Sequence, residues 1–243
     1  MTGRDAWRQR FVLGAVAGGI ISGATGDYGD ARTSPSLVLP ANYAFSVWGP
    51  IYAGAIGYAA YQGGSDRLED PLLRRTGWLS GTSLGLSGLW VRAQDSPALQ
   101  LPLIAATACT GVAAYLRALP QTESELSSAS ARWLVREPLG LYAGWITLAT
   151  VAATTEALIA QGYKAPPPGP EVWSSLALAG TAAAALAMDR RFPVAASYPA
   201  VLAWGFAAVA VRVSRRHRIT GITAALAAGA AALAAGRGLR VPG

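Results

Sequence analysis

Long apolar stretches alternate with short polar segments along the whole chain. A helix needs about 20 mostly apolar residues to cross the hydrocarbon core of a bilayer. Stretches such as 98–116 lack the strict apolar/polar alternation of a membrane-barrel strand, so we predict helices. The eight predicted spans cover residues 11–25, 43–61, 77–91, 98–116, 138–158, 172–188, 194–211 and 219–235.

Short segments rich in turn residues join these stretches, and one of them interrupts the pattern strongly. Residues 166–170 read Pro-Pro-Pro-Gly-Pro, and a run of prolines cannot continue a helix. We therefore predict an all-α polytopic transmembrane helix bundle in which residues 1–160 hold five spans. Residues 161–170 form a proline-rich loop, and residues 171–243 add three C-terminal spans.

Glycines recur four residues apart in several of the predicted spans. Gly14 and Gly18 form one such pair, and Gly140 and Gly144 form another. Small residues at this spacing let helix backbones approach closely, which holds membrane helices together. The pairs predict a tight bundle and carry no chemistry of their own.

Composition supports the membrane assignment. The 243 residues are 52% hydrophobic and 14% charged, whereas a soluble domain carries about 25% charged residues. The net charge of +7 comes from arginines at the ends of the spans, where they contact lipid headgroups. We therefore expect the lipid bilayer as a partner and no nucleic acid.

The positive charges also predict an orientation. If the N-terminus is cytoplasmic, thirteen arginines fall on the inner side, against Arg32, Arg92 and Lys164 on the outer side before the seventh span. Four further arginines lie in the last outer loop and contradict the rule: Arg212, Arg215, Arg216 and Arg218.

Cysteine and histidine each occur once, at Cys109 and His217. A structural metal site draws on several such ligands, and a disulfide needs two cysteines. The sequence predicts neither.

The second predicted span carries the most informative motif. Phe45, Trp48 and Tyr52 are spaced i, i+3 and i+7, so one helix face presents three aromatic rings. Pro50 removes a backbone hydrogen bond and is predicted to kink the span near Ser46. An interfacial aromatic belt is the plainer interpretation of these residues.

The fifth predicted span carries a second aromatic face, with Tyr142 and Trp145 one turn apart. Trp145 lies about two turns into the span, deeper than a belt residue usually lies. Trp90 ends the third span. Two aromatic faces on separate spans favour a binding site over a belt.

These motifs resemble the TspO/peripheral benzodiazepine receptor family of tryptophan-rich sensory proteins, in a longer branch with extra C-terminal helices. The resemblance covers residues 11–158. It implies five membrane helices that bind porphyrins and other flat apolar ligands, with Trp48, Trp145 and Tyr52 on the family's pocket positions. Two family amides are replaced here by Ser87 and Ala153, which puts the family's ligand preference in doubt. The residues predicted to bind ligand are Asn42, Phe45, Trp48, Tyr52, Trp90, Tyr142 and Trp145.

The leading functional hypothesis is a sensor or carrier whose ligand, a tetrapyrrole or similar planar molecule, is held non-covalently in a slot between Trp48 and Trp145. Arg92 or Arg32 at the mouth would pair with porphyrin carboxylates. One alternative is a membrane enzyme for an apolar substrate, such as a cyclase or a tetrapyrrole-degrading enzyme, with Glu156 or Asp27 as general acid or base. Another is a structural subunit of a membrane complex. The sequence is also compatible with a homodimer.

Overall fold

The computed structural model describes residues 3–26, 33–94, 96–191 and 195–239, and in these ranges the chain is helical with no strand. The predicted all-α class is confirmed. The long helices are α1 (Gly3–Ala24), α2 (Trp48–Gln62), α3 (Pro71–Arg92), α4 (Pro97–Ala118), α7 (Glu137–Ala160), α8 (Pro170–Arg191), α9 (Ser197–Val213) and α10 (Arg218–Leu239). The short elements are η1 (Asn42–Val47), η2 (Ser65–Arg67), α5 (Glu123–Ser127), α6 (Ala129–Ala131) and the π-helical turn η3 (Arg132–Arg136).

Proline marks the beginning of several long helices. Pro71, Pro97 and Pro170 each occupy the first position of a helix, where the missing N–H removes no helical hydrogen bond. Asp70 caps α3 by accepting hydrogen bonds from the backbone N–H groups of Leu72 and Leu73. The predicted spans at 98 and 172 begin within two residues of α4 and α8, whereas α3 begins six residues before the predicted span at 77.

Four helical segments of the described chain are long and apolar enough to cross a membrane: Ala98–Ala118, Ala129–Ala160, Pro170–Met188 and Arg218–Leu239. The apolar helix Ser197–Val213 is shorter than these. Helices α1 and α3 are not among these four, and both carry charged residues near their ends, such as Arg4 and Arg10 in α1 and Arg74 and Arg75 in α3. A count of eight spans stays a prediction.

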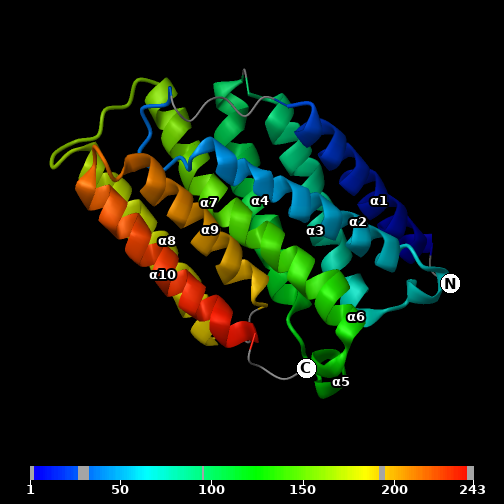
Figure 1. Ribbon diagram of the computed structural model, residues 1–243. Coiled ribbons are helices and arrows are strands. Elements are labelled where there is room, and N and C mark those ends of the chain that lie inside the picture. The colour runs from blue at the N-terminus through cyan, green and yellow to red at the C-terminus, as the bar shows by residue number, and fades with distance from the viewer. Residues whose placement is uncertain (1–2, 27–32, 95, 192–194, 240–243) are drawn as a thin grey trace.

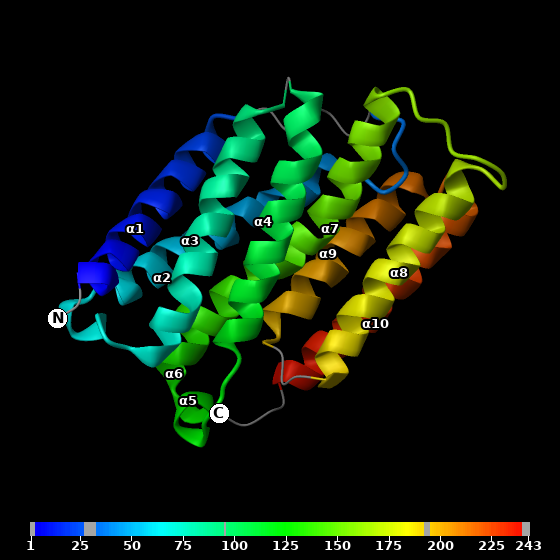
Figure 2. The same cartoon turned by 180° about the vertical axis from the view of Figure 1, so that it is seen from behind.

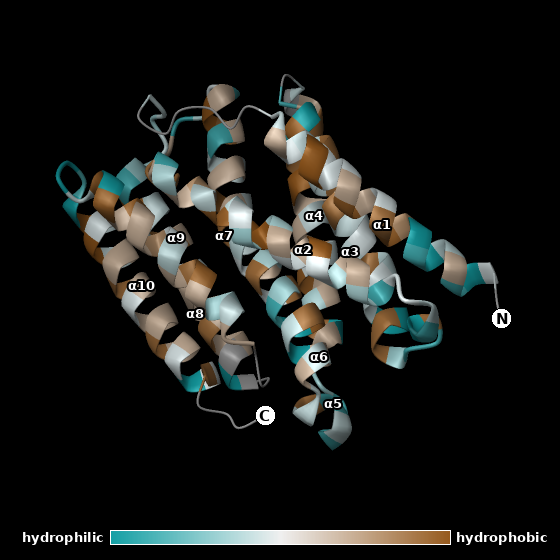
Figure 3. Cartoon of the chain, turned by 45° about the vertical axis from the view of Figure 1, so that its right-hand side comes forward, coloured by the Kyte–Doolittle hydropathy of each residue, from teal (hydrophilic) through white to brown (hydrophobic). Residues whose placement is uncertain are grey.

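Successive long helices run in opposite directions, so the chain returns to the same end of the bundle after each pair (Figures 1 and 2). Neighbouring helices follow the order α1, α3, α4, α7, α9, α10 and α8, and α2 packs against α1 and α7. Figure 3 shows the most hydrophilic residues concentrated toward the ends of the helices. One cluster of buried apolar side chains includes residues of α1, α7, α9 and α10. Helix α9 packs against both α7 and α10, so it connects the C-terminal helices to the rest of the bundle.

Close helix packing accounts for some of the glycine pairs. A Cβ on Gly81 would lie 2.6 Å from a ring carbon of Phe11, which places α1 against α3. A Cβ on Gly140 would lie 2.8 Å from Ser197 Oγ in α9. Gly14 and Gly18 have no atom within 4 Å of a built Cβ, so this pair does not pack against the described chain.

The second predicted span begins differently from the expectation. A 3₁₀ helix covers Asn42–Val47, and the α-helix begins only at Trp48, so Pro50 lies in its first turn. Proline is tolerated there, whereas inside a helix it would leave the carbonyl of Ser46 without its donor. The predicted kink near Ser46 is therefore a change of helix type.

At the end of the bundle where α3 begins, Arg75 of α3 forms a bidentate ion pair with Glu125 of α5. The two nitrogen–oxygen distances are 2.6 and 2.8 Å, and Glu125 also accepts a hydrogen bond from the backbone N–H of Gln121. The hydrogen bond from Arg75 is the main reason that the pKa of Glu125 is lowered from its usual value.

We expect Glu125→Gln to lower the free energy of unfolding by about 1 kcal/mol at pH 7, because the exchange removes an ion pair with good geometry. A carboxyl with a lowered folded pKa stabilises the fold above its unfolded pKa, and this contribution is lost as the pH falls through the folded pKa. Unfolding in detergent measured from pH 7 down to pH 3 should show the difference shrinking in acid. Glu123→Gln, an exposed neighbour, is the control. If the difference in unfolding free energy between the parent and Glu125→Gln does not change with pH, the lowered pKa of Glu125 would be contradicted.

Candidate functional site

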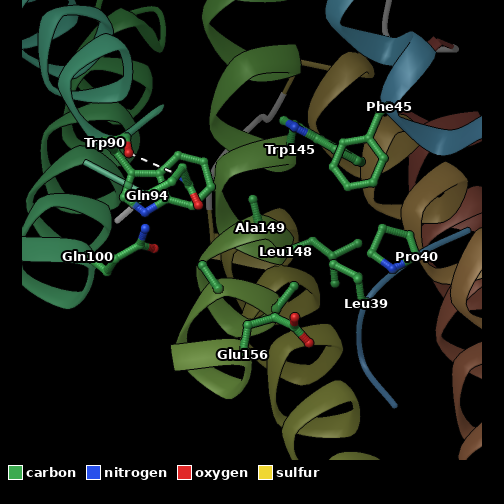
Figure 4. Close-up of a pocket in the computed structure, with 12 residues that line it drawn as sticks. Leu39, Pro40, Phe45, Trp90, Gln94, Gln100, Trp145, Leu148, Ala149 and Glu156 are labelled. Atoms are coloured by element: carbon green, nitrogen blue, oxygen red, sulfur yellow. Dashed lines mark hydrogen bonds between the residues drawn. The ribbon is translucent and has the colours of Figure 1, made fainter. Parts of the chain in front are cut away.

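The candidate site is a cavity of about 220 Å³ between η1, α3, the beginning of α4 and α7 (Figure 4). Aromatic and aliphatic side chains form most of its surface, and three polar side chains also line it. The lining residues are Leu39, Pro40, Phe45, Trp90, Gln94, Gln100, Trp145, Leu148, Ala149, Ala152, Ala153 and Glu156.

Three of the predicted ligand-binding residues line this cavity, each from a different element. Phe45 comes from η1, Trp90 from α3 and Trp145 from α7. Phe45 and Trp145 contact each other edge to face, with ring centroids 5.7 Å apart at 85°. Trp90 lies across the cavity from this pair (Figure 4).

The predicted slot between Trp48 and Trp145 is absent. The two indoles contact each other edge to face, with centroids 6.4 Å apart at 82°, which leaves no room for a ring between them. Trp48 also stacks on Tyr52 at 5.3 Å. The two motifs do converge as predicted, but the open space lies between Trp145 and Trp90, and neither Trp48 nor Tyr52 is among the lining residues.

The remaining two predicted residues have other surroundings. The hydroxyl of Tyr142 donates to the backbone oxygen of Ser83 at 3.1 Å and lies 3.1 Å from the Ser83 hydroxyl, so Tyr142 joins α7 to α3. Asn42 is exposed at the beginning of η1. Neither residue lines the cavity.

The polar side chains among the lining residues are those of Glu156, Gln94 and Gln100. The amide of Gln94 donates to the backbone oxygen of Trp90, and the amide of Gln100 donates to that of Ala93, both at 3.2 Å. The carboxylate of Glu156 accepts a hydrogen bond from the hydroxyl of Ser34. The indole N–H of Trp90 is buried and has no hydrogen-bond partner among the described residues. A ligand with an acceptor group would satisfy this donor.

Sequence reasoning missed Gln94 and Gln100, which lie in and just after the connection between the third and fourth predicted spans. Polar residues in such a connection show no periodicity, so nothing marked their side chains as facing inward. Ala153, at a position where the resemblance implies an amide, lines the cavity. The missing amide therefore makes this part of the surface more apolar.

The cations proposed at the mouth are not among the lining residues. Arg92 donates a hydrogen bond to the hydroxyl of Thr25 at the end of α1. Arg32 lies outside the described residues, as does the alternative acid Asp27. Glu156 is the one charged side chain in the described lining. Pairing of an arginine with ligand carboxylates stays a prediction.

A family model described as TSPO-like protein matches residues 12–237 of the chain. The match is longer than the resemblance over 11–158 that the aromatic motifs carry, since it includes the proline-rich loop and helices α8 to α10. A search of curated proteins and a search of solved structures found no match.

Proposed function

The chain belongs to the family of TSPO-like proteins, and from this premise we propose that it is a membrane sensor or carrier for a flat apolar ligand bound between Trp90 and Trp145. The observation that carries the proposal is the convergence of rings from η1, α3 and α7 on one cavity. Offset or edge-to-face contact with an aromatic ligand adds about 0.5–1.5 kcal/mol per ring pair beyond burial.

The size of the cavity bears on the ligand. Its volume of about 220 Å³ is below the range of about 300–1,000 Å³ that is common for small-molecule sites. A ligand of a few fused rings fits this space better than a whole macrocycle. We propose a tetrapyrrole as the first ligand class to test, and its binding would require the cavity to widen.

We expect Trp90→Ala to weaken binding of protoporphyrin IX by at least about tenfold, which corresponds to about 1.4 kcal/mol, because one ring contact and its buried area are lost. Titration of the purified protein, followed by tryptophan fluorescence and porphyrin absorbance, measures the dissociation constant.

Trp78→Ala is the matched control for this experiment. Trp78 is also on α3, is 37% exposed and stacks on Phe11 at 5.3 Å, away from the cavity. Its replacement should leave affinity unchanged. The neutral dimethyl ester of protoporphyrin provides a second comparison, because equal affinity for diacid and ester would argue against pairing with Arg92. If Trp90→Ala binds as tightly as the parent protein, the cavity is not the site.

A further inference from the structure

One wall of the cavity is formed by the segment 34–40, which precedes η1 and has no regular secondary structure. Leu39 and Pro40 of this wall segment line the cavity between Trp90 and Trp145. Pro35, Ser36 and Leu37 line a second cavity of about 540 Å³ between the end of α7 and the beginning of α8. The wall segment therefore separates two spaces, and its position determines the volume of both.

Arg212 of α9 holds the wall segment by its backbone. One guanidinium nitrogen, Nη1, donates to the backbone oxygens of Ser36 and Leu39 at 2.6 and 3.0 Å. The other, Nη2, donates to the backbone oxygen of Ser34 at 2.8 Å. A single side chain thus satisfies three carbonyls of a segment that has no helix or strand to do so.

The charge on Arg212 has a counterpart on α7. Glu156 accepts a hydrogen bond from the hydroxyl of Ser34, and its negative charge acts on Arg212. Hydrogen bonds from an ionised donor are about twice as strong as neutral ones. The wall segment is therefore fixed from both sides, and Val38 at its centre is 0% exposed.

Two more contacts extend the attachment to α9 beyond the wall segment. The backbone N–H of Ala41 donates to the carbonyl of Ala208 at 3.3 Å. The indole N–H of Trp204 donates to the carbonyl of Ala44 in η1 at 3.0 Å. Helix α9 follows the proline-rich loop, so the C-terminal helices contribute directly to the wall of a cavity built mainly by the first five spans.

Resting on the proposed function, we propose that Arg212 is a positioning residue of the ligand site, which fixes the wall segment and thereby limits the size of ligand admitted. The same contacts account for one arginine that contradicts the positive-inside rule. Arg212 donates hydrogen bonds to the carbonyls of the wall segment, and this role, rather than membrane orientation, explains its position.

A cysteine at position 38 reports on the wall segment without any ligand. In a Cys109→Ser background, which removes the exposed natural thiol, Val38→Cys should react slowly with a membrane-permeant maleimide. Adding Arg212→Gln should raise the labelling rate at least about tenfold, because opening becomes more frequent. Arg215→Gln is the control, since Arg215 is exposed and makes no contact with the wall segment. An unchanged rate in Arg212→Gln would overturn the proposal.

Arg212→Lys tests geometry against charge. A lysine keeps the charge but lacks the planar fork that reaches three carbonyls, so the labelling rate should fall between those of the parent and Arg212→Gln. If Arg212→Gln does not fold, as judged by near-ultraviolet circular dichroism, Arg212→Lys alone carries the test. A parent-like rate in a folded Arg212→Lys protein would then overturn the proposal.

Ligand exchange provides the second measurement. Arg212→Gln should speed both association and dissociation of protoporphyrin IX by at least about fivefold, with a smaller effect on a smaller aromatic ligand such as 1-anilinonaphthalene-8-sulfonate. Faster labelling with no porphyrin binding in the parent would uphold the role of Arg212 in fixing the wall segment and refute the proposed function. Porphyrin binding in the parent, with exchange rates unaffected by Arg212→Gln, would refute the role in ligand size and leave the proposed function standing.

Discussion

Replacing Asp5 with asparagine is expected to lower the free energy of unfolding by about 3 kcal/mol or more, since removing one partner of a buried ion pair leaves the other charge uncompensated. The remaining charge is that of Arg8, whose side chain is 1% exposed at the beginning of α1. Arg8 donates to Asp5 Oδ1 at 3.1 Å and to the backbone oxygen of Leu68 at 3.0 Å.

The Asp5 carboxylate also receives two hydrogen bonds from Arg74 of α3, at 3.1 and 2.7 Å. Asp5 therefore joins α1 to the beginning of α3, while Arg8 joins α1 to the connection between α2 and α3. The contacts among α1, the α2–α3 connection and the beginning of α3 therefore depend on one carboxylate. This dependence is why the expected effect exceeds that of an exposed pair.

Titration with sodium dodecyl sulfate in mixed micelles, followed by tryptophan fluorescence, measures this loss. Asp66→Asn is the control, because the Asp66 side chain is 72% exposed and its pair with Arg67 should contribute at most about 1 kcal/mol. The double variant Asp5→Leu/Arg8→Met should recover part of the loss, since apolar replacements of a buried pair are often tolerated. A single Asp5→Asn variant as stable as the parent would contradict the buried-pair interpretation.

The second large effect is expected at the contact between α7 and α9. A Cβ on Gly144 would lie 2.6 Å from the backbone oxygen of Tyr198 and 2.5 Å from Val201 Cγ1. A backbone oxygen cannot turn aside as a side chain does, so Gly144→Ala must separate the two helices. Overpacking of this kind costs about 1–3 kcal/mol.

Gly180→Ala is the matched control for Gly144→Ala. Gly180 lies on α8 with no atom within 4 Å of a built Cβ, so alanine there should be neutral or stabilise the helix by up to about 1 kcal/mol. Detergent unfolding measures both variants. Arg212 of α9 holds the wall segment in place, so a displaced α9 should also displace that segment. Gly144→Ala should therefore raise the maleimide labelling rate of Val38→Cys. Equal stability of the two alanine variants would contradict the close approach of α7 and α9.

Local features of the sequence account for most of the helices. The apolar run at 98–116 corresponds to α4 (Pro97–Ala118), and the run at 138–158 corresponds to α7 (Glu137–Ala160). Long apolar segments must satisfy their own backbone groups, and proline and aspartate mark helix ends through local hydrogen bonding. The aromatic motifs likewise carried the family resemblance, and the match to the TSPO-like family bears out that assignment.

Other features depend on residues far apart in the chain. The motifs predicted that Trp48 and Trp145 converge, but spacing along one helix does not set its rotation against another. That rotation brings the two indoles into contact with each other and leaves the open space beside Trp90. Gln94 and Gln100 line the cavity for the same reason, because the end of α3 and the beginning of α4 lie beside it.

The amino-acid sequence by itself determined the helical class, the membrane setting, the family and the aromatic residues around which the candidate site is built. Only the tertiary structure decided which rings face open space and how Arg212 meets a segment more than 170 residues earlier. The physical reason is that helix formation and membrane insertion depend on neighbouring residues. A cavity is instead the space left after helices pack, and its shape depends on every side chain at their contacts.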